Sequence, residues 1–137
     1  MRTAYGGGSV TREEIIESYR AYIACLNRQD WQDLHHYVAD QVEYNGATIG
    51  LDGYRDMLVA DFRAIPDLSF NIAVLVCDPP MIASRLAFDC TPVGQLFGLP
   101  VNGTQVRFDE NVFYEFGEGK IRRVWSVIDK SSIAAQI

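Results

Sequence analysis

Apolar positions in the first part of the chain recur at the spacing of a helix. Six of them fall on one face over residues 12–28, namely Ile15, Ile16, Tyr19, Tyr22, Ile23 and Leu26. Thr11 and Glu14 have the spacing of a capping box, in which each side chain bonds to the backbone of the other residue and starts a helix. A helix with one buried face is therefore predicted over residues 12–28.

Two shorter helices follow in the pattern. Asp30 is a suitable N-cap for a helix over residues 31–39. A further apolar stripe predicts a helix over residues 52–64, which has to end before Pro66 because proline disfavours a helical conformation in the preceding residue. Each of these helices has an apolar face that needs a partner.

Most of the remaining chain alternates between apolar and polar positions with a period of two, as strands do. Strands are predicted over residues 41–45, 68–77, 81–91, 105–116 and 120–129. Helices followed by antiparallel strands indicate an α+β fold, here one domain over residues 12–137 after a flexible lead over residues 1–11. A curved, mostly antiparallel sheet with three helices across its concave face would form a cone-shaped pocket for a small molecule.

Charge and composition narrow the functional class. The formal net charge is −6 and no more than two basic residues are adjacent, so a nucleic-acid partner is not expected. The three cysteines, an odd number without metal-ligand spacing, fit reduced and buried thiols. The sequence shows no apolar run long enough to span a bilayer and no signal peptide, so no membrane partner is expected and the predicted location is cytoplasmic.

One predicted strand carries a charged residue on its apolar face. In VRFDENVFYEF, residues 106–116, the alternation places Glu110 in the middle of the apolar stripe. A carboxylate that faces an apolar pocket loses hydration, so its pKa should rise toward neutrality and make it a usable acid or base. The alternative is an ion pair with Arg85, Arg107 or Arg123, or a β-bulge that turns the side chain outward.

Other polar side chains are weaker candidates. Tyr22 and Tyr44 could present hydroxyl groups to the pocket and hold a developing oxyanion, or simply pack in the core. Asn45 could orient a water or a carbonyl group, although an Asn before a Gly is also typical of a turn. Asp129 is a candidate acid or base at the end of the last strand, and Trp125, on the same alternation, could lie at the rim or at a dimer face.

Several short segments then occur in a fixed order. They are Gly50-Leu51-Asp52-Gly53-Tyr54, Ile65-Pro66-Asp67-Leu68-Ser69-Phe70, Ser84-Arg85-Leu86, Gly94-Gln95-Leu96-Phe97-Gly98-Leu99-Pro100, Asn102-Gly103, Gly119-Lys120-Ile121, Trp125 and Asp129. In their order and spacing, the chain resembles the SnoaL-like polyketide cyclase and ester cyclase family of the nuclear-transport-factor-2-like superfamily. The resemblance implies a cone-shaped α+β fold, a homodimer or higher oligomer, and a small hydrophobic ligand bound without metal or organic cofactor.

The resemblance also implies site residues. The histidine that transfers protons in the cyclases falls at Glu110, and their aspartate falls at Val124 or Ser126. The oxyanion-holding tyrosine of ketosteroid isomerases in the same superfamily falls at Tyr22, and their general-base aspartate falls near Tyr44. Both comparisons place the reacting groups inside the cone.

Two functions remain open at this point. The first is a cofactor-independent enzyme of the cyclase or isomerase type that acts on a polyketide-like or carbonyl metabolite, with Glu110, Tyr22 and Asp129 as catalytic residues. The second is a carrier or binding protein that has the pocket without the chemistry. In both cases no metal site is expected, and the predicted ligand-binding residues are Tyr44, Asn45, Tyr19, Phe108, Tyr114, Ser126, Trp125 and Phe97.

Overall fold

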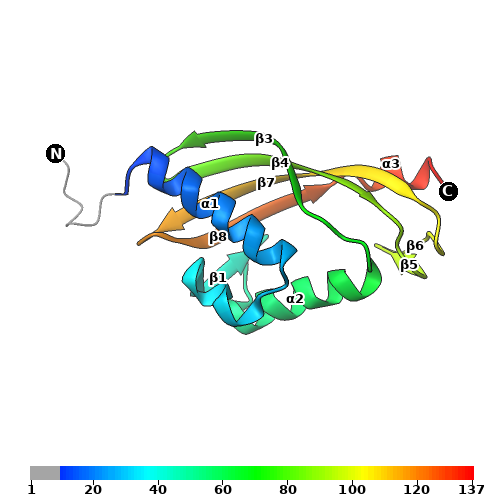
Figure 1. Cartoon of the computed structure of the whole chain (residues 1–137), viewed down its shortest axis with the longest axis horizontal. Helices are drawn as coiled ribbons and strands as arrows, with labels where there is room; N and C mark the ends of the chain where they lie inside the picture. The colour runs from blue at the N-terminus through cyan, green and yellow to red at the C-terminus, as the bar shows by residue number, and fades with distance from the viewer. Residues whose placement is uncertain (1–9) are drawn as a thin grey trace.

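The structure of this chain, a computed structural model, describes residues 10–137 (Figure 1). The first half contains α1 (Arg12–Asn27), the 3-10 helix η1 (Trp31–His36), β1 (Val38–Tyr44), β2 (Ala47–Thr48) and α2 (Gly50–Ala64). The second half contains β3 (Asn71–Asp78), β4 (Met81–Cys90), β5 (Gln95–Leu96), β6 (Leu99–Pro100), β7 (Val106–Gly117), β8 (Lys120–Ile128) and α3 (Lys130–Ala134). The predicted α+β fold is confirmed, and the predicted lead lies mostly outside the described residues.

The main sheet has the strand order β2-β1-β8-β7-β4-β3. Its centre is antiparallel, because β7 pairs with β4 from Cys90↔Val106 to Met81↔Glu115 and with β8 on its other side. β1 is the exception, since it runs parallel to β8. The first strand of the chain thus joins the last one, and the sheet is mixed.

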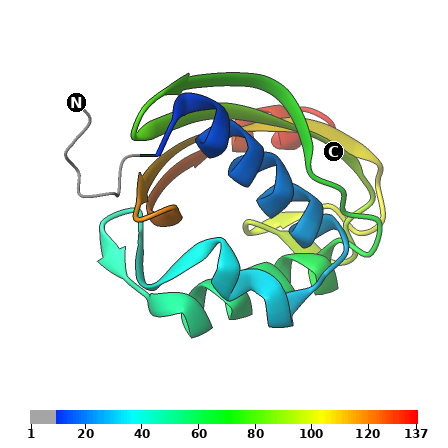
Figure 2. The same ribbon diagram turned by 60° about the vertical axis from the view of Figure 1, so that its left-hand side comes forward.

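Two helices lie on the concave side of this sheet. Figure 2 shows α1 crossing the curve of the sheet, with α2 lying opposite β4 and β7. The β5–β6 hairpin lies near the C-terminal end of α2, where the backbone N–H of Val93 donates to the carbonyl of Ala64 at 2.9 Å. The sheet, α1, α2 and the hairpin therefore surround one interior region.

The start of α1 is fixed by the predicted capping box. The backbone N–H of Glu14 donates to the Thr11 hydroxyl at 3.1 Å, and that of Thr11 donates to the Glu14 carboxylate at 2.9 Å. These bonds satisfy donors that a helix N-terminus otherwise leaves free. The apolar face of α1 and the inward positions of β7 then bury against each other in one core.

The alternation predicted for residues 68–77 does not survive in β3. The register with β4 shifts between Ile72 and Val74, and such a bulge reverses which residues face the core. Val74 and Val76 are consequently 49% and 57% exposed on the outer face of the sheet, whereas Cys77 is buried. A bulge of this kind depends on the partner strand, so the single strand does not reveal it.

Smaller differences concern the helices. The second helix is a 3-10 helix that ends at His36, and the side chain of Asp30 makes no capping hydrogen bond there. α2 begins at Gly50, two residues before the predicted start, and α3 was not predicted. The three cysteines are free and buried, as predicted. Within residues 10–137, no helix combines the length and apolar character that crossing a membrane requires.

Candidate functional site

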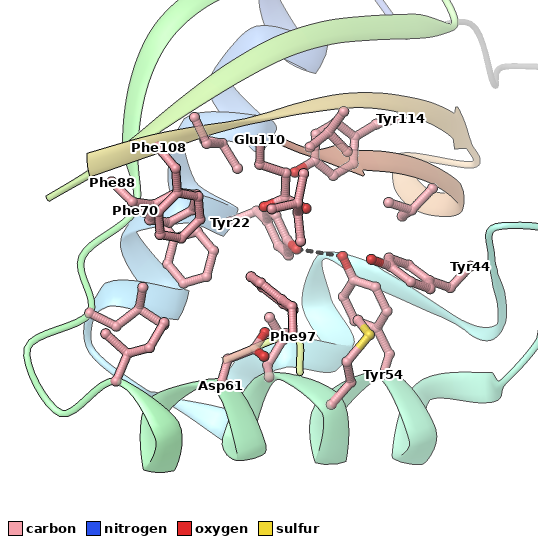
Figure 3. Close-up of a pocket in the computed structure, with 18 residues that line it drawn as sticks. Tyr22, Tyr44, Tyr54, Asp61, Phe70, Phe88, Phe97, Phe108, Glu110 and Tyr114 are labelled. Atoms are coloured by element: carbon pink, nitrogen blue, oxygen red, sulfur yellow. Dashed lines mark hydrogen bonds between the residues drawn. The ribbon is translucent and has the colours of Figure 1, made fainter. Parts of the chain in front are cut away.

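A cavity of about 170 Å³ lies between the concave face of the sheet and α2 (Figure 3). Its wall is mainly apolar, with aliphatic side chains and with the rings of Tyr22, Tyr44, Tyr54, Phe70, Phe88, Phe97, Phe108 and Tyr114. Among the described residues that line it, Glu110 and Asp61 carry the only charges, and there is no lysine, arginine or histidine. The cavity is therefore apolar with a few polar groups, as ligand sites usually are.

Glu110 reaches this cavity from β7, as the alternation predicted. It lies between Leu86 of β4 and Ile128 of β8, and its carboxylate accepts a hydrogen bond from the Ser126 hydroxyl. Ser126 precedes Ile128 by two positions on the same face, which brings its hydroxyl diagonally opposite Glu110. Burial raises the pKa of Glu110 above its ordinary value, and the hydrogen bond from Ser126 opposes that shift.

The arginines that the sequence offered as partners of Glu110 bond elsewhere. Arg107 donates to Asp89 at 3.1 Å, Arg123 to Glu43 at 3.3 Å, and Arg85 to Asn111 at 2.9 Å. The irregularity of β7 lies between Glu115 and Phe116, away from Glu110. Both alternatives to an inward carboxylate are thus contradicted.

Two tyrosines form a hydroxyl pair in the cavity. The hydroxyl oxygens of Tyr22 from α1 and Tyr54 from α2 lie 2.7 Å apart (Figure 3). Burial raises the pKa of both, so both stay neutral and keep their protons. Only one of the two protons is used in the shared bond, which leaves the other available to a ligand oxygen.

Tyr19, a predicted ligand-binding residue, lies outside the lining. Its side chain is fully buried, its hydroxyl donates to Ser84 at 2.8 Å, and its ring centroid lies 4.8 Å from that of Tyr114. Burial is the main cause that raises its pKa to about 12. Tyr19 supports Tyr114, which does line the cavity, and the prediction that Tyr19 binds a ligand is corrected.

Asp61 is the residue that sequence reasoning missed. It lines the cavity from α2, and burial, with the charge of Glu110 as a second cause, raises its pKa from 3.8 to about 7. A signal existed, because Tyr54, Leu58 and Ile65 lie on the same helix face at spacings of three and four around Asp61.

Phe97 lies at the edge of the cavity, on the turn between β5 and β6. Its φ of 51° is in the left-handed region, and its side chain is 38% exposed while it still lines the cavity. Its ring meets that of Phe108 edge-on at 6.3 Å, and the ammonium group of Lys130 lies 5.6 Å from its ring centroid. Phe97 therefore connects the interior with the surface.

The comparison with protein families supports the resemblance seen in the sequence. The sequence model of the SnoaL-like polyketide cyclases matches residues 16–137, most of the chain. The chain belongs to the SnoaL-like polyketide cyclase family. Its fold is accordingly that of the nuclear-transport-factor-2-like superfamily. The comparison with curated proteins gave no match.

Solved structures resemble this SnoaL-like protein closely. A SnoaL-like polyketide cyclase from Agrobacterium tumefaciens is 52% identical, with a TM-score of 0.88 over 89% of this chain and 96% of that one. TsrD from Streptomyces laurentii has a TM-score of 0.82 at 19% identity, over 93% of this chain and 97% of its own. IdmH from Streptomyces antibioticus has a TM-score of 0.78 at 16% identity, over 89% of this chain and 96% of its own. The last two show the fold alone.

Most of the side chains predicted for the site of this SnoaL-like protein do meet in the cavity. Glu110, Tyr22, Tyr44, Phe97, Phe108 and Tyr114 line it. Tyr44 is half-buried, and burial raises its pKa, an effect that Ser126 opposes. Ser126 itself stands behind Glu110 as its hydrogen-bond donor. Their roles toward a ligand stay predictions.

Besides Tyr19, three predicted site residues lie elsewhere. Asn45 has a φ of 48° and accepts a hydrogen bond from the backbone N–H of Ser126 at 2.8 Å, so it joins the end of β1 to β8 instead of facing a ligand. Trp125 is on the outer face of the sheet, opposite Phe113. Asp129 caps α3 by accepting from the N–H of Ser132 at 3.1 Å.

Each of these three placements has a local reason. The parity of β8 that turns Ser126 inward turns Trp125 outward, and Asp129 follows the end of the strand. Asn45 occupies a positive-φ turn, the alternative that its sequence context allowed. Within residues 10–137, no group of three or more histidine, cysteine, aspartate or glutamate side chains has the geometry of a metal site.

Proposed function

We propose that this SnoaL-like protein is an acid–base enzyme of the cyclase or isomerase type, which acts on a small apolar carbonyl compound with Glu110 as general base. The supporting observation is the carboxylate of Glu110 in an aromatic cavity, held by Ser126 and not paired with an arginine. A carboxylate of raised pKa can remove a proton from a carbon next to a carbonyl group. Such a transfer needs side chains alone, without a cofactor.

The hydroxyl pair of Tyr22 and Tyr54 supplies the second requirement of this chemistry. Removal of the proton leaves negative charge on the carbonyl oxygen, and neutral hydroxyl donors in a water-poor cavity stabilise it strongly. The two hydroxyls are 2.7 Å apart and come from different helices, so their positions are held from both sides. In this proposal they bind the enolate oxygen.

The size of the cavity restricts the substrate. A volume of about 170 Å³ is close to that of cavities known to hold one benzene-sized molecule, about 150 Å³. A compound of roughly one ring therefore fits without repacking, and a longer one would have to extend past Phe97 to the surface. The polyketide-like substrate of this proposal is correspondingly short.

Replacement of Glu110 tests the proposal. Glu110→Gln keeps the size of the side chain and its bond to Ser126 but cannot accept a proton, so turnover should fall by about 10²–10⁴ with ligand affinity preserved. The measurement is steady-state turnover of a short diketone, together with calorimetric binding of the cyclised product. Asp109→Asn, one residue away on the other face of β7, is the matched control and should keep turnover.

Equal turnover in the Glu110→Gln variant and the wild-type protein would contradict the proposal. The second candidate, a binding protein without chemistry, is favoured by the eight aromatic rings of the cavity, which suit binding whether or not a reaction follows. It predicts that the wild-type protein binds apolar carbonyl compounds and turns none of them over. The same two measurements thus separate the candidates.

A second copy of the chain is the proposed macromolecular partner. Val74, Val76, Phe113, Trp125 and Val127 are 38–70% exposed on the outer face of the sheet and form an apolar surface there. Light scattering after size-exclusion chromatography should give a dimer or higher oligomer, and Val127→Lys should lower its mass. A monomeric wild-type protein would contradict this proposal.

A further inference from the structure

We propose that Asp61 is a second catalytic residue of the cavity, which delivers a proton to the substrate oxygen while Glu110 takes one from carbon. The inference rests on the proposed function of Glu110 and deepens it. The reaction considered is a ring closure, in which an enolisable carbon at one end of an uncharged substrate attacks a carbonyl group at the other end.

The geometry places the two carboxyl groups on opposite walls. Glu110 comes from β7 and Asp61 from α2, and both point into the same cavity, with the hydroxyl pair of Tyr22 and Tyr54 to one side (Figure 3). A substrate between the walls would meet one carboxyl group on each face. Removal of a proton on one side and its delivery on the other is then geometrically accessible.

The two carboxyl groups have different surroundings, and this decides which is acid and which is base. Ser126 donates to Glu110 and favours its ionised form. Asp61 makes no side-chain hydrogen bond within residues 10–137 and faces the charge of Glu110, so its pKa lies near 7 and it retains a proton at neutral pH in a substantial share of the molecules. Environments that differ in this way mark an acid–base pair.

The other groups that face Asp61 are neutral or distant. Tyr44 from β1, Tyr54 from α2 and Tyr22 from α1 line the same cavity with raised pKa values, so they add no charge near neutral pH. Lys130 contacts Phe97 at the edge, and its ammonium group is 5.6 Å from that ring. The lining, as far as the structure describes it, offers no cation that would ionise Asp61.

The reaction balances without any further reactant. Glu110 takes the proton from the α-carbon, and the electrons of the C–H bond form an enolate. The enolate carbon bonds to the second carbonyl carbon, and the π electrons of that carbonyl move to its oxygen. This oxygen takes the proton of Asp61. Glu110 has gained a proton and Asp61 has lost one, so the pair is reset by exchanging one proton between the two groups through water.

The charges of the cavity also indicate what it excludes. Two carboxyl groups and no cation among the described lining residues disfavour an anionic substrate such as a free acid, because its charge would meet like charges in an apolar environment. A neutral diketone, or a neutral ester of a keto acid, meets no such penalty. The inference therefore predicts that esters react and the corresponding acids do not.

Two measurements on one probe compound test whether Glu110 acts as the base and Asp61 as the acid. The probe is heptane-2,6-dione, which exchanges α-hydrogen for deuterium when it enolises and forms a six-membered ring when it closes. Of the two carboxyl groups, exchange requires only Glu110, whereas closure requires both. Asp61→Asn should keep exchange within a few-fold of wild type and lose closure by about 10²–10³, whereas Glu110→Gln should lose both. Asp56→Asn, on the exposed side of α2, is the matched control.

The outcomes separate the two proposals. Exchange that survives in Glu110→Gln contradicts the proposed function of Glu110. Closure at the wild-type rate in Asp61→Asn, or an equal loss of exchange and closure there, overturns the role of Asp61 alone. A closure rate that falls as the pH rises through about 7, with no such fall in the exchange rate, supports the role of Asp61, because deprotonation removes its acidic proton.

A titration tests Asp61 without turnover. Carbon-13 NMR of the Asp61 carboxyl group, assigned with Asp61→Asn, should give a pKa near 7 in the wild-type protein. Glu110→Gln should lower it, because the negative charge of Glu110 is one of its causes. An ordinary pKa in the wild-type protein would overturn the inference, whichever substrate the protein uses.

Discussion

The cavity has a strand wall, formed by the sheet, and a helix wall, formed by α2, and each carries one carboxyl group. The surroundings of the two carboxyl groups differ. On the strand wall, the neighbouring strand β8 places the Ser126 hydroxyl against Glu110. On the helix wall, Asp61 projects from α2 among apolar neighbours without a comparable donor in the described part of the chain. The carboxyl group on the strand wall thus has a hydrogen-bond donor, and the one on the helix wall has none among the described residues.

The difference follows from the two kinds of element. A strand inside a sheet has neighbours on both sides at fixed register, so a polar partner can be built beside any inward residue. A helix that faces a cavity has its next inward residues a full turn away along its own axis. A carboxyl group without a hydrogen-bond donor, which stays protonated more easily, is therefore favoured on a helix wall. A carboxylate stabilised by a donor is favoured on a sheet.

The largest expected effect is on the stability of the protein, and it comes from Asp61 on the helix wall. The pKa of Asp61 is about 7 in the folded chain and 3.8 ordinarily, so the folded state binds the proton more tightly than the unfolded state does. Stability is therefore unaffected below about pH 4 and falls as the pH rises to 7. At pH 8 Asp61→Asn should raise the free energy of unfolding by roughly 2 to 4 kcal/mol, at about 1.36 kcal/mol per pKa unit.

Urea denaturation at pH 4 and pH 8 measures this effect. Asp56→Asn, which removes an exposed carboxylate 3.5 Å from Arg55, should change stability by no more than about 0.5 kcal/mol at either pH. An Asp61→Asn variant no more stable than wild type at pH 8 would show that Asp61 is not desolvated. The contrast between the two walls would then be lost.

The next largest effect comes from removing the hydrogen-bond donor of Glu110 on the strand wall. Ser126→Ala deletes the hydroxyl that stabilises ionised Glu110, so the pKa of Glu110 should rise further. Exchange of α-hydrogen at weakly acidic pH should fall roughly ten-fold, since hydrogen bonds to charged groups contribute about 1.5–3 kcal/mol, and should recover at higher pH. Ser131→Ala, a hydroxyl deletion on α3, should leave the profile unchanged.

The hydroxyl pair that links α1 to α2 gives a smaller effect. Tyr54→Phe breaks the bond to Tyr22 and leaves that hydroxyl without its partner, which should cost about 1 kcal/mol of stability. Enolisation should slow as well, because one donor to the enolate oxygen is missing. Thermal unfolding and the exchange assay measure the two consequences, and unchanged exchange would exclude the pair from the reaction.

The smallest expected effect tests whether Asn45 positions Ser126. Asn45 accepts from the N–H of Ser126 at 2.8 Å, so Asn45→Ala should loosen the donor of Glu110 without touching the cavity. Exchange should fall by a few-fold, with the same shift in pH profile as Ser126→Ala but weaker. A loss of rate with no shift in the profile would indicate a general loosening of β1 instead.

The success of sequence analysis differed between particular residues. Alternation along residues 106–116 located Glu110, because strand parity is a local property that neighbouring strands rarely reverse. The same parity turns Trp125 outward, so the prediction that Trp125 binds a ligand is wrong. The helical spacing of apolar residues around Asp61 is a signal in the sequence, whereas the bulge in β3 leaves no signal in its own strand.

The sequence by itself determined most of the longer helices and strands, the α+β class, the family and the inward direction of Glu110, since capping and periodicity depend on residues close along the chain. Only the tertiary structure decided which carboxyl groups face each other and which of them has a donor. Asp61 comes from α2, far in the sequence from the adjacent strands β7 and β8 that carry Glu110 and its donor Ser126, and only the folded sheet and helix bring the two carboxyl groups to one cavity. Their protonation depends on burial and on neighbours, two properties that the chain acquires when it folds.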